Sequence, residues 1–147
     1  MSGSSRALLL SRLVIAIGLL TAGAAALTWW TGRSGRVILA GSFHTVTHKG
    51  SGKAEVVEEK SGARYIQLSN FQTYPAEDLR VCLAPLPDAE NTESVRDAGM
   101  SCVGTLAGTG KRFALPSALD LRRFRTVVIW NPAAAVNFTA APLERVN

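Results

Sequence analysis

Nineteen consecutive residues near the N-terminus, from Leu13 to Thr31, carry no charged side chain. A helix of roughly 20 residues covers the hydrocarbon core of a bilayer, which is about 30 Å thick. Trp29 and Trp30 stand at one end of the run, where amphipathic rings favour the headgroup level. A helix that is apolar on every side needs a much larger protein to bury it in a soluble core. We therefore expect residues 13–31 to form a transmembrane helix.

The same segment also fits a cleaved secretory signal. Its apolar region would be Leu13–Leu20, and its small-residue cleavage site Ala22-Gly23-Ala24 or Ala24-Ala25-Ala26. We favour an uncleaved anchor because the run stays apolar through Trp30. The expected protein is single-pass, with residues 1–12 in the cytoplasm and the C-terminal domain in the periplasm or at the cell surface. The alternative is secretion after signal cleavage.

The formal charge of +5 is concentrated next to this segment. Residues 1–36 hold four arginines and no acid, whereas residues 37–147 hold twelve Lys or Arg against eleven acids. A nucleic-acid-binding domain needs a basic face of its own, because phosphate contacts supply much of the affinity. We therefore expect no nucleic acid partner. The expected partners are the lipid bilayer, through residues 13–31, and a membrane protein complex.

Beyond Arg36 the hydrophobic pattern changes to the two-residue period of strands with one buried face. Ile66 and Leu68, for example, share one face of their run. Turn-forming residues separate eight such runs, which are Val37–Leu39, Ala54–Glu59, Arg64–Leu68, Leu79–Leu83, Cys102–Leu106, Arg112–Leu115, Thr126–Trp130 and Ala135–Ala140. Short strands at this spacing are typical of an antiparallel sandwich or barrel. We expect an all-β fold, an antiparallel β-sandwich of about eight strands.

Two segments depart from this pattern. Ser117–Phe124 is the only one that suits a helical turn. Pro85–Gly99 contains four acids and begins with two closely spaced prolines, which predicts an acidic exposed loop.

The chain contains no recognisable catalytic motif. The glycines at 108 and 110 lack the spacing and the hydroxyl of a phosphate-binding loop, and there is no dinucleotide fingerprint or nucleophile elbow. His44 and His48 would chelate one metal only if the chain between them curled, because four residues of extended strand separate them by about 13 Å. We expect surface or hydrogen-bonded histidines, no metal site and no enzymatic activity.

Cys82 and Cys102 are the only cysteines. In an oxidising compartment an even pair favours one disulfide. Two buried thiols, or a reactive or cofactor-bearing cysteine, are the alternatives. Covalent haem would need a Cys-x-x-Cys-His motif, which is absent, and noncovalent haem would need His44, His48 or Met100 as an axial ligand. We expect no cofactor, with haem as the alternative.

Several short motifs follow one another in a distinctive order. In the first half they are Gly41-Ser42-Phe43, His48-Lys49-Gly50-Ser51-Gly52, Ala54-Glu55-Val56, Ile66-Gln67-Leu68-Ser69-Asn70-Phe71 and Asp78-Leu79-Arg80-Val81-Cys82-Leu83. In the second half they are Gly104-Thr105-Leu106, Phe113-Ala114-Leu115-Pro116, Leu119-Asp120-Leu121, Val127-Val128-Ile129-Trp130 and Val136-Asn137-Phe138. This ordered set resembles the DM-thirteen domain, a family associated with electron transfer. The resemblance covers residues 41–143, leaving 32–40 as a linker with the first short strand and 144–147 as a C-terminal tail.

The resemblance implies a β-sandwich related to the DOMON-type domains and displayed outside the cytoplasm. It also implies electron transfer through a nearly invariant cysteine just after an Ile-Trp pair, where this sequence has Asn131. An amide neither cycles between thiol and disulfide nor replaces a thiolate as a soft metal ligand. We therefore expect a binding or accessory module of a membrane-associated redox or energy-transducing complex. The alternative is an electron-transfer domain that carries haem or uses a reactive thiol.

Charge and motif position together suggest a set of contact residues. Residues 111–125 carry a local charge of +4, whereas residues 76–99 carry −4. The basic segment suits anionic lipid or an acidic partner. A solvated strand edge with charges that prevent aggregation is the commoner explanation of such a segment. The candidate ligand or partner contacts are His48, Asn131, Arg122, Arg123 and Arg125.

Overall fold

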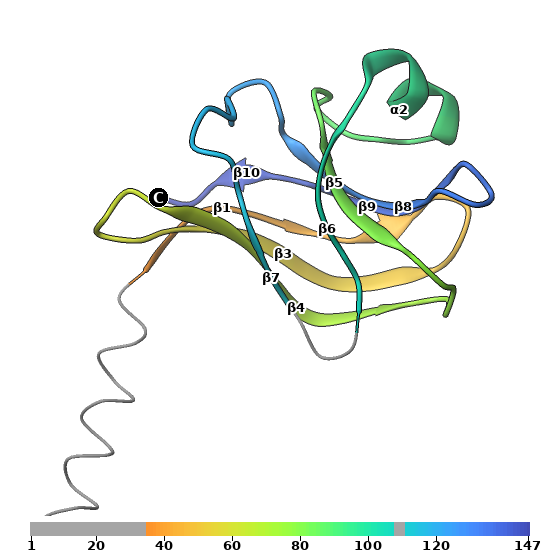
Figure 1. Ribbon diagram of the computed structural model, residues 1–147, viewed down its shortest axis with the longest axis horizontal. Helices are drawn as coiled ribbons and strands as arrows, with labels where there is room; N and C mark the ends of the chain where they lie inside the picture. Colours follow the sequence, from red (N-terminus) through yellow and green to blue (C-terminus); the bar gives the residue numbers. More distant parts are fainter. Residues whose placement is uncertain (1–34, 108–110) are drawn as a thin grey trace, which may run out of the picture. The chain divides into compact units, whose positions relative to one another are not determined.

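Figure 1 shows the computed structural model, which describes residues 35–107 and 111–147. Within these ranges the chain forms ten β-strands and one short helix. The elements are β1 (Arg36–Ser42), β2 (His44–Thr45), β3 (Gly50–Glu58), β4 (Arg64–Thr73), β5 (Arg80–Ala84), α2 (Thr92–Ala98), β6 (Ser101–Thr105), β7 (Arg112–Ala114), β8 (Thr126–Asn131), β9 (Val136–Pro142) and β10 (Glu144–Arg145). All eight predicted runs contain a strand, and the two-residue strands β2 and β10 are additional.

The strands form two five-stranded antiparallel sheets that face each other (Figure 1). The first sheet has the order β10-β1-β3-β4-β7, and the second has the order β2-β9-β8-β5-β6. The prediction of an all-β antiparallel sandwich is confirmed, with ten strands described instead of about eight. The sandwich also extends past residue 143, because Arg145 pairs with Leu39 of β1.

The predicted transmembrane helix, with its alternative as a signal segment, falls on residues 13–31, which lie outside the described residues. Among residues 35–107 and 111–147, no helix is both long and apolar enough to cross a membrane. The membrane anchor therefore stays a prediction.

Side chains from both sheets meet in one main core. Ile66 and Leu68 of β4 share it with Val81 and Leu83 of β5 and with Ile129 of β8, and all five are buried. The predicted alternation in β4 is confirmed by its burial pattern. Burying each such side chain stabilises the fold by about 1.5–3 kcal/mol, so the two sheets are held together mainly by this layer.

The outer face of the second sheet is buried as well. Cys82, Val128 and Trp130 belong to a second hydrophobic cluster, which also contains Ala89 and Val95 from the segment between β5 and β6. Strands β5 and β8 are consequently buried almost throughout. This explains why their sequences read as nearly continuous apolar runs.

Part of that covering segment is helical. The prediction of an exposed loop over Pro85–Gly99 is wrong for Thr92–Ala98, which form α2. The Asn91 side chain caps the helix by accepting a hydrogen bond from the Ser94 amide at 2.8 Å. Val95 is buried, so the helix forms because one apolar residue packs on the sheet while the acids face solvent.

Strand β1 is irregular at two points. Its register on β3 shifts between Val37 and Leu39. At this bulge both Ile38 and Leu39 contact the main core, whereas a regular strand would alternate them. Farther along, Gly41 lies directly against the carbonyl of Pro142, and a Cβ there would overlap that oxygen. Only glycine permits this close approach.

Candidate functional site

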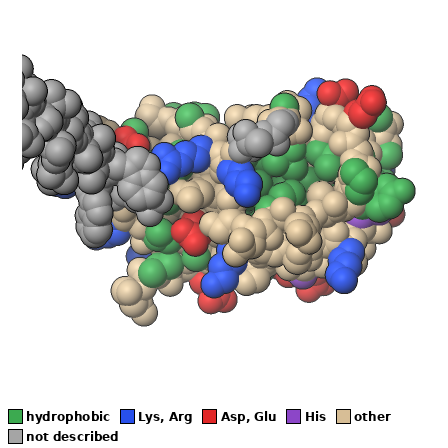
Figure 2. Space-filling model, turned by 90° about the horizontal axis from the view of Figure 1, so that it is seen from below, with side chains coloured by type: hydrophobic (Ala, Val, Ile, Leu, Met, Phe, Trp, Pro, Cys, Tyr) green, Lys and Arg blue, Asp and Glu red, His purple; other side chains and the backbone are tan. Residues whose placement is uncertain are grey.

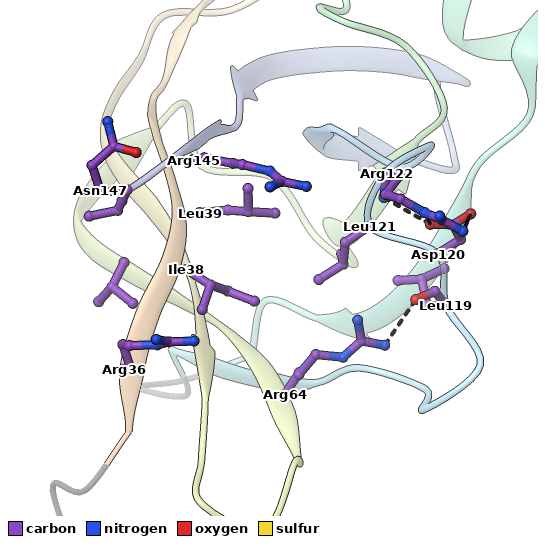
Figure 3. A pocket seen from close by; sticks show the side chains of 12 residues that line it. Arg36, Ile38, Leu39, Arg64, Leu119, Asp120, Leu121, Arg122, Arg145 and Asn147 are labelled. Carbon is purple, nitrogen blue, oxygen red and sulfur yellow. Dashed lines mark hydrogen bonds and ion pairs between the residues drawn. The ribbon is translucent and has the colours of Figure 1, made fainter.

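A pocket of about 720 Å³ opens where β1, β10 and the start of β4 meet the turn at residues 119–122 (Figure 3). Ligand pockets commonly have volumes of about 300–1,000 Å³. The size therefore suits a small molecule or one part of a larger ligand.

The pocket lining combines apolar side chains with guanidinium groups. The apolar side chains are Val37, Ile38, Leu39, Leu119, Leu121 and Val146. The charged ones are Arg36, Arg64, Arg122 and Arg145 against a single acid, Asp120, so the lining side chains carry a net charge of +3. Such a site is suited to a ligand that has both an anionic and an apolar part.

Arg64 has a structural role in this pocket. Its Nη2 atom donates hydrogen bonds to the carbonyl oxygens of Leu119 at 2.9 Å and Ser117 at 3.2 Å. These bonds attach the turn before β8 to the start of β4. Arg64 therefore helps to shape the pocket, while its charge still faces the cavity (Figure 3).

Arg122 is engaged by the one acid of the lining. Its Nε donates to Asp120 Oδ1 at 3.1 Å, and its backbone amide donates to the same oxygen at 2.9 Å. The side-chain hydrogen bond and then the backbone hydrogen bond lower the pKa of Asp120. Asp120 is thus ionised at neutral pH and offsets much of the charge of Arg122.

Arg36 and Arg145 extend from β1 and β10 toward the cavity (Figure 3). Glu58 is the register partner of Arg36, yet it is not within ion-pair distance of it. Over the described ranges, the only ion pairs are Arg122–Asp120 and His44–Asp88. The guanidinium groups of Arg36 and Arg145 therefore have no carboxylate partner in this part of the chain.

Sequence reasoning missed three of the four pocket arginines. Arg36, Arg64 and Arg145 are distant in sequence, and only the pairing of β1 with β3 and β10, and of β3 with β4, brings them to one edge. The sequence offered only a weak indication of this grouping, since Arg36 directly precedes one predicted strand and Arg64 begins another. Of the predicted contacts, only Arg122 lines the pocket.

Arg123 and Arg125 have other neighbours. The guanidinium of Arg123 lies 5.7 Å from the ring centroid of Phe124, and Nη2 of Arg125 donates to the Leu143 carbonyl at 3.3 Å. Figure 2 shows Lys and Arg side chains at several places on one face, with an apolar area toward the right. The three predicted arginines are therefore not gathered around one ligand, and the roles of Arg123 and Arg125 as contacts stay predictions.

His44 connects the edge strand β2 to the segment that carries α2. Its Nε2 lies 2.7 Å from Asp88 Oδ1, and its Nδ1 lies 3.1 Å from the Thr45 carbonyl oxygen. Burial lowers the pKa of His44, but the hydrogen bonds to Asp88 and Thr45, with the charges of Asp88 and Glu90, raise it above 6.5 overall. Both ring nitrogens face acceptors, which favours the imidazolium form.

His48 packs between two aromatic rings. Its ring centroid lies 4.0 Å from that of Phe138 and 5.1 Å from that of Tyr74, on which it is stacked. Phe138 is buried, whereas Tyr74 is 61% exposed. His48 therefore has a packing role, and its role as a ligand or partner contact stays a prediction.

The weak haem-ligand candidates are not brought to one site by these contacts. His44 bonds Asp88, His48 stacks on Tyr74, and Met100 packs on the hydrophobic cluster of Trp130. The described part of the chain also contains no group of three or more His, Cys, Asp or Glu residues that could hold a metal ion.

Asn131 holds the turn between β8 and β9. Its Oδ1 accepts hydrogen bonds from the backbone amides of Ala133 at 3.1 Å and Ala134 at 3.3 Å. Asparagine is common in such turns because its short side chain bonds the backbone two residues on. The side chain at this position is therefore used for local structure.

Cys82 and Cys102 form a disulfide between neighbouring strands, which confirms that prediction. Cys82 is fully buried on the inner strand β5, whereas Cys102 is exposed on the neighbouring edge strand β6. Because these are the only cysteines of the chain, neither is a free thiol in this oxidised form.

Comparison with known families agrees with the order of the motifs. A family model described as Electron transfer DM13 matches residues 42–143, more than half of the chain. No curated protein and no solved structure matches the chain significantly. The two-sheet sandwich and the matched segment coincide along almost their whole length. The chain belongs to the Electron transfer DM13 family, the DM-thirteen domain that its motifs resemble.

Proposed function

We propose that this chain is a membrane-anchored, extracytoplasmic DM13 domain that binds a partner, as an accessory module of a membrane-associated redox or energy-transducing complex. The observation that carries the proposal concerns the position at which the resemblance implies a cysteine. Asn131 stands there and holds a turn, while Cys82 and Cys102 are bonded to each other. In this oxidised form the chain therefore has no free thiol for redox chemistry, whereas the arginine-lined pocket offers a binding site.

Two features support a location at the outer side of a membrane. The uncharged run from Leu13 to Thr31 has the length of a bilayer span. The Cys82–Cys102 disulfide is of the kind that persists in oxidising compartments and is rare in the cytosol. Together they favour an anchor that holds the sandwich outside the cytoplasm.

Location and partner are tested on the full-length protein in its native cells. Protease added to intact cells, or to cells with an opened outer envelope, is expected to remove the domain while a cytoplasmic control protein survives. Survival of the domain until the inner membrane is lysed would contradict the proposed location. In mild detergent, affinity purification is expected to retain a membrane protein at a constant ratio. Recovery of the chain alone from native membranes would contradict the accessory role.

A second candidate function uses the disulfide as a two-electron carrier. Accepting two electrons and two protons would convert the Cys82–Cys102 bond into two thiols, and a dithiol partner would supply them by attack at the exposed Cys102. Equilibration in redox buffers, followed by alkylation and mass measurement, tests this. Half-reduction near about −200 mV would favour a carrier, whereas half-reduction only below about −300 mV is typical of a structural bond.

A further inference from the structure

We infer that the pocket binds one acidic phospholipid, with the phosphate at the arginines and the adjoining alkyl chain on the apolar wall. This inference deepens the proposed function and rests on its membrane anchor. The pocket lining supports this, because four arginines and one acid lie beside six aliphatic side chains. A purely ionic ligand would leave the aliphatic surface wet, and a purely apolar one would leave the guanidinium groups without an anion.

The arginines differ in how far they are available to a ligand. Arg122 is bonded to Asp120, and Arg64 is bonded to backbone carbonyls. Arg36 and Arg145 have no carboxylate partner in the part of the chain that the structure describes. Guanidinium groups bind phosphate through two parallel hydrogen bonds, which are roughly twice as strong as neutral ones. We therefore assign the phosphate to Arg36 and Arg145.

The apolar wall lies next to these two arginines. Ile38 and Leu39 follow Arg36 in the chain, and the bulge in β1 lets both contact the core side of the sheet. Val146 follows Arg145 and is 49% exposed, an unusual position for a large aliphatic side chain beside a cavity. An alkyl chain on this wall would cover Val146 and Leu121 from water, which is favourable at about 25 cal/mol per Å².

The short connection between the proposed anchor and β1 limits how far the pocket could lie from a bilayer. Five residues lead from Thr31, the end of the uncharged run, to Arg36 at the start of β1. Fully extended, they span at most about 18 Å. If residues 13–31 cross the bilayer, Arg36, which lines the pocket, cannot move far from the lipid headgroups. A lipid of the surrounding membrane is therefore the anionic amphiphile that the pocket meets at the highest local concentration.

The test measures lipid binding to the full-length protein in mild detergent by native mass spectrometry. The probes are phosphatidylglycerol and phosphatidylcholine with identical acyl chains, with laurate and inorganic phosphate as further probes. We expect phosphatidylglycerol to bind about tenfold more tightly than phosphatidylcholine. Phosphatidylglycerol carries a net negative charge, whereas the choline group of phosphatidylcholine balances the charge of its phosphate. The variant R36A/R145A should lose that preference. The control R80A/R112A removes the same charge outside the pocket and should keep it.

A steric variant separates the pocket from general surface charge. L121W keeps all arginines but fills the cavity, and it should lose phosphatidylglycerol binding as R36A/R145A does. Thermal midpoints are measured for every variant, and Arg36 and Arg145 are exposed, so their removal should leave the fold intact. A failure of the lipid inference can be distinguished from a failure of the proposed location. The protease assay tests the location of the domain, and its result does not depend on lipid binding.

Three results would overturn the inference. The first is equal affinity for the two phospholipids in the wild-type protein. The second is equal loss of binding in R36A/R145A and R80A/R112A, which would assign the effect to overall charge. The third is binding of laurate, or full displacement by inorganic phosphate, at the concentration where phosphatidylglycerol binds, since either would assign the site to another anion.

Discussion

Reducing the Cys82–Cys102 bond should lower the free energy of unfolding by about 3 kcal/mol. The bond joins residues with a sequence separation of 20, and the chain-entropy model gives about 3 kcal/mol for closing a loop of that length. The edge strand β6 pairs in the sheet only with β5, so it depends on this link more than the inner strands do. We therefore expect β6 and the α2 segment to be the first region to open after reduction.

Urea unfolding followed by tryptophan fluorescence measures this loss. Trp130 is only 8% exposed, so its emission shifts on unfolding. A Trp29→Phe/Trp30→Phe background makes it the sole tryptophan. With an m value of about 1.5 kcal/mol per M, the midpoint should fall by about 2 M urea.

The reduced protein keeps both sulfur atoms, so it isolates the effect of the cross-link. The variant C82A/C102A also loses the contacts of the buried Cys82 sulfur and should be less stable than the reduced protein. If oxidised and reduced protein, verified by mass, unfold at the same urea concentration, the loop-closure reasoning is refuted.

Three further predictions concern single residues. Because the pKa of His44 is raised above 6.5, its bond to Asp88 should stabilise the fold fully below pH 6.5 and lose this contribution as pH rises through the raised pKa. The stability difference between wild type and H44Q, measured by urea midpoint from pH 5 to about 8, should shrink over that range; a constant difference would contradict it. Ala135 has φ of 52°, in the left-handed region, so A135G should raise stability by about 0.5 kcal/mol, whereas A133G in the same turn should lower it. Asn137 is fully buried, and its side-chain amide has no hydrogen-bond partner in the described part of the chain. N137D should therefore cost about 3 kcal/mol or more at pH 7, and less as pH falls toward about 4, because burial raises the pKa of the new acid; a cost independent of pH would contradict this.

The strands were predictable because their burial is local in sequence. Ile66 and Leu68 alternate with polar neighbours, and Val127-Val128-Ile129 reads as a strand buried on both faces. Helix α2 was missed because it contains few apolar residues and buries only Val95. Its stability comes from packing on the sheet and from the Asn91 cap. The nearby prolines favoured the interpretation of this segment as a loop.

The pocket was not predictable, since it depends on register. Arg36 and Arg64 both align with Glu58 across three strands, and Arg145 joins them because β10 pairs with β1. No short window of sequence contains more than one of these residues. By contrast, the role of Asn131 was partly readable, because an Asn-Pro pair between two apolar runs indicates a turn.

The visible absorption spectrum of the full-length protein, purified from native membranes in mild detergent, tests binding against electron transfer most directly. If Asn131 has replaced the redox group of the family with a structural one, the purified chain should show no Soret band at about 400–430 nm. A Soret band that belongs to this chain and shifts on reduction would show a bound haem and contradict the account.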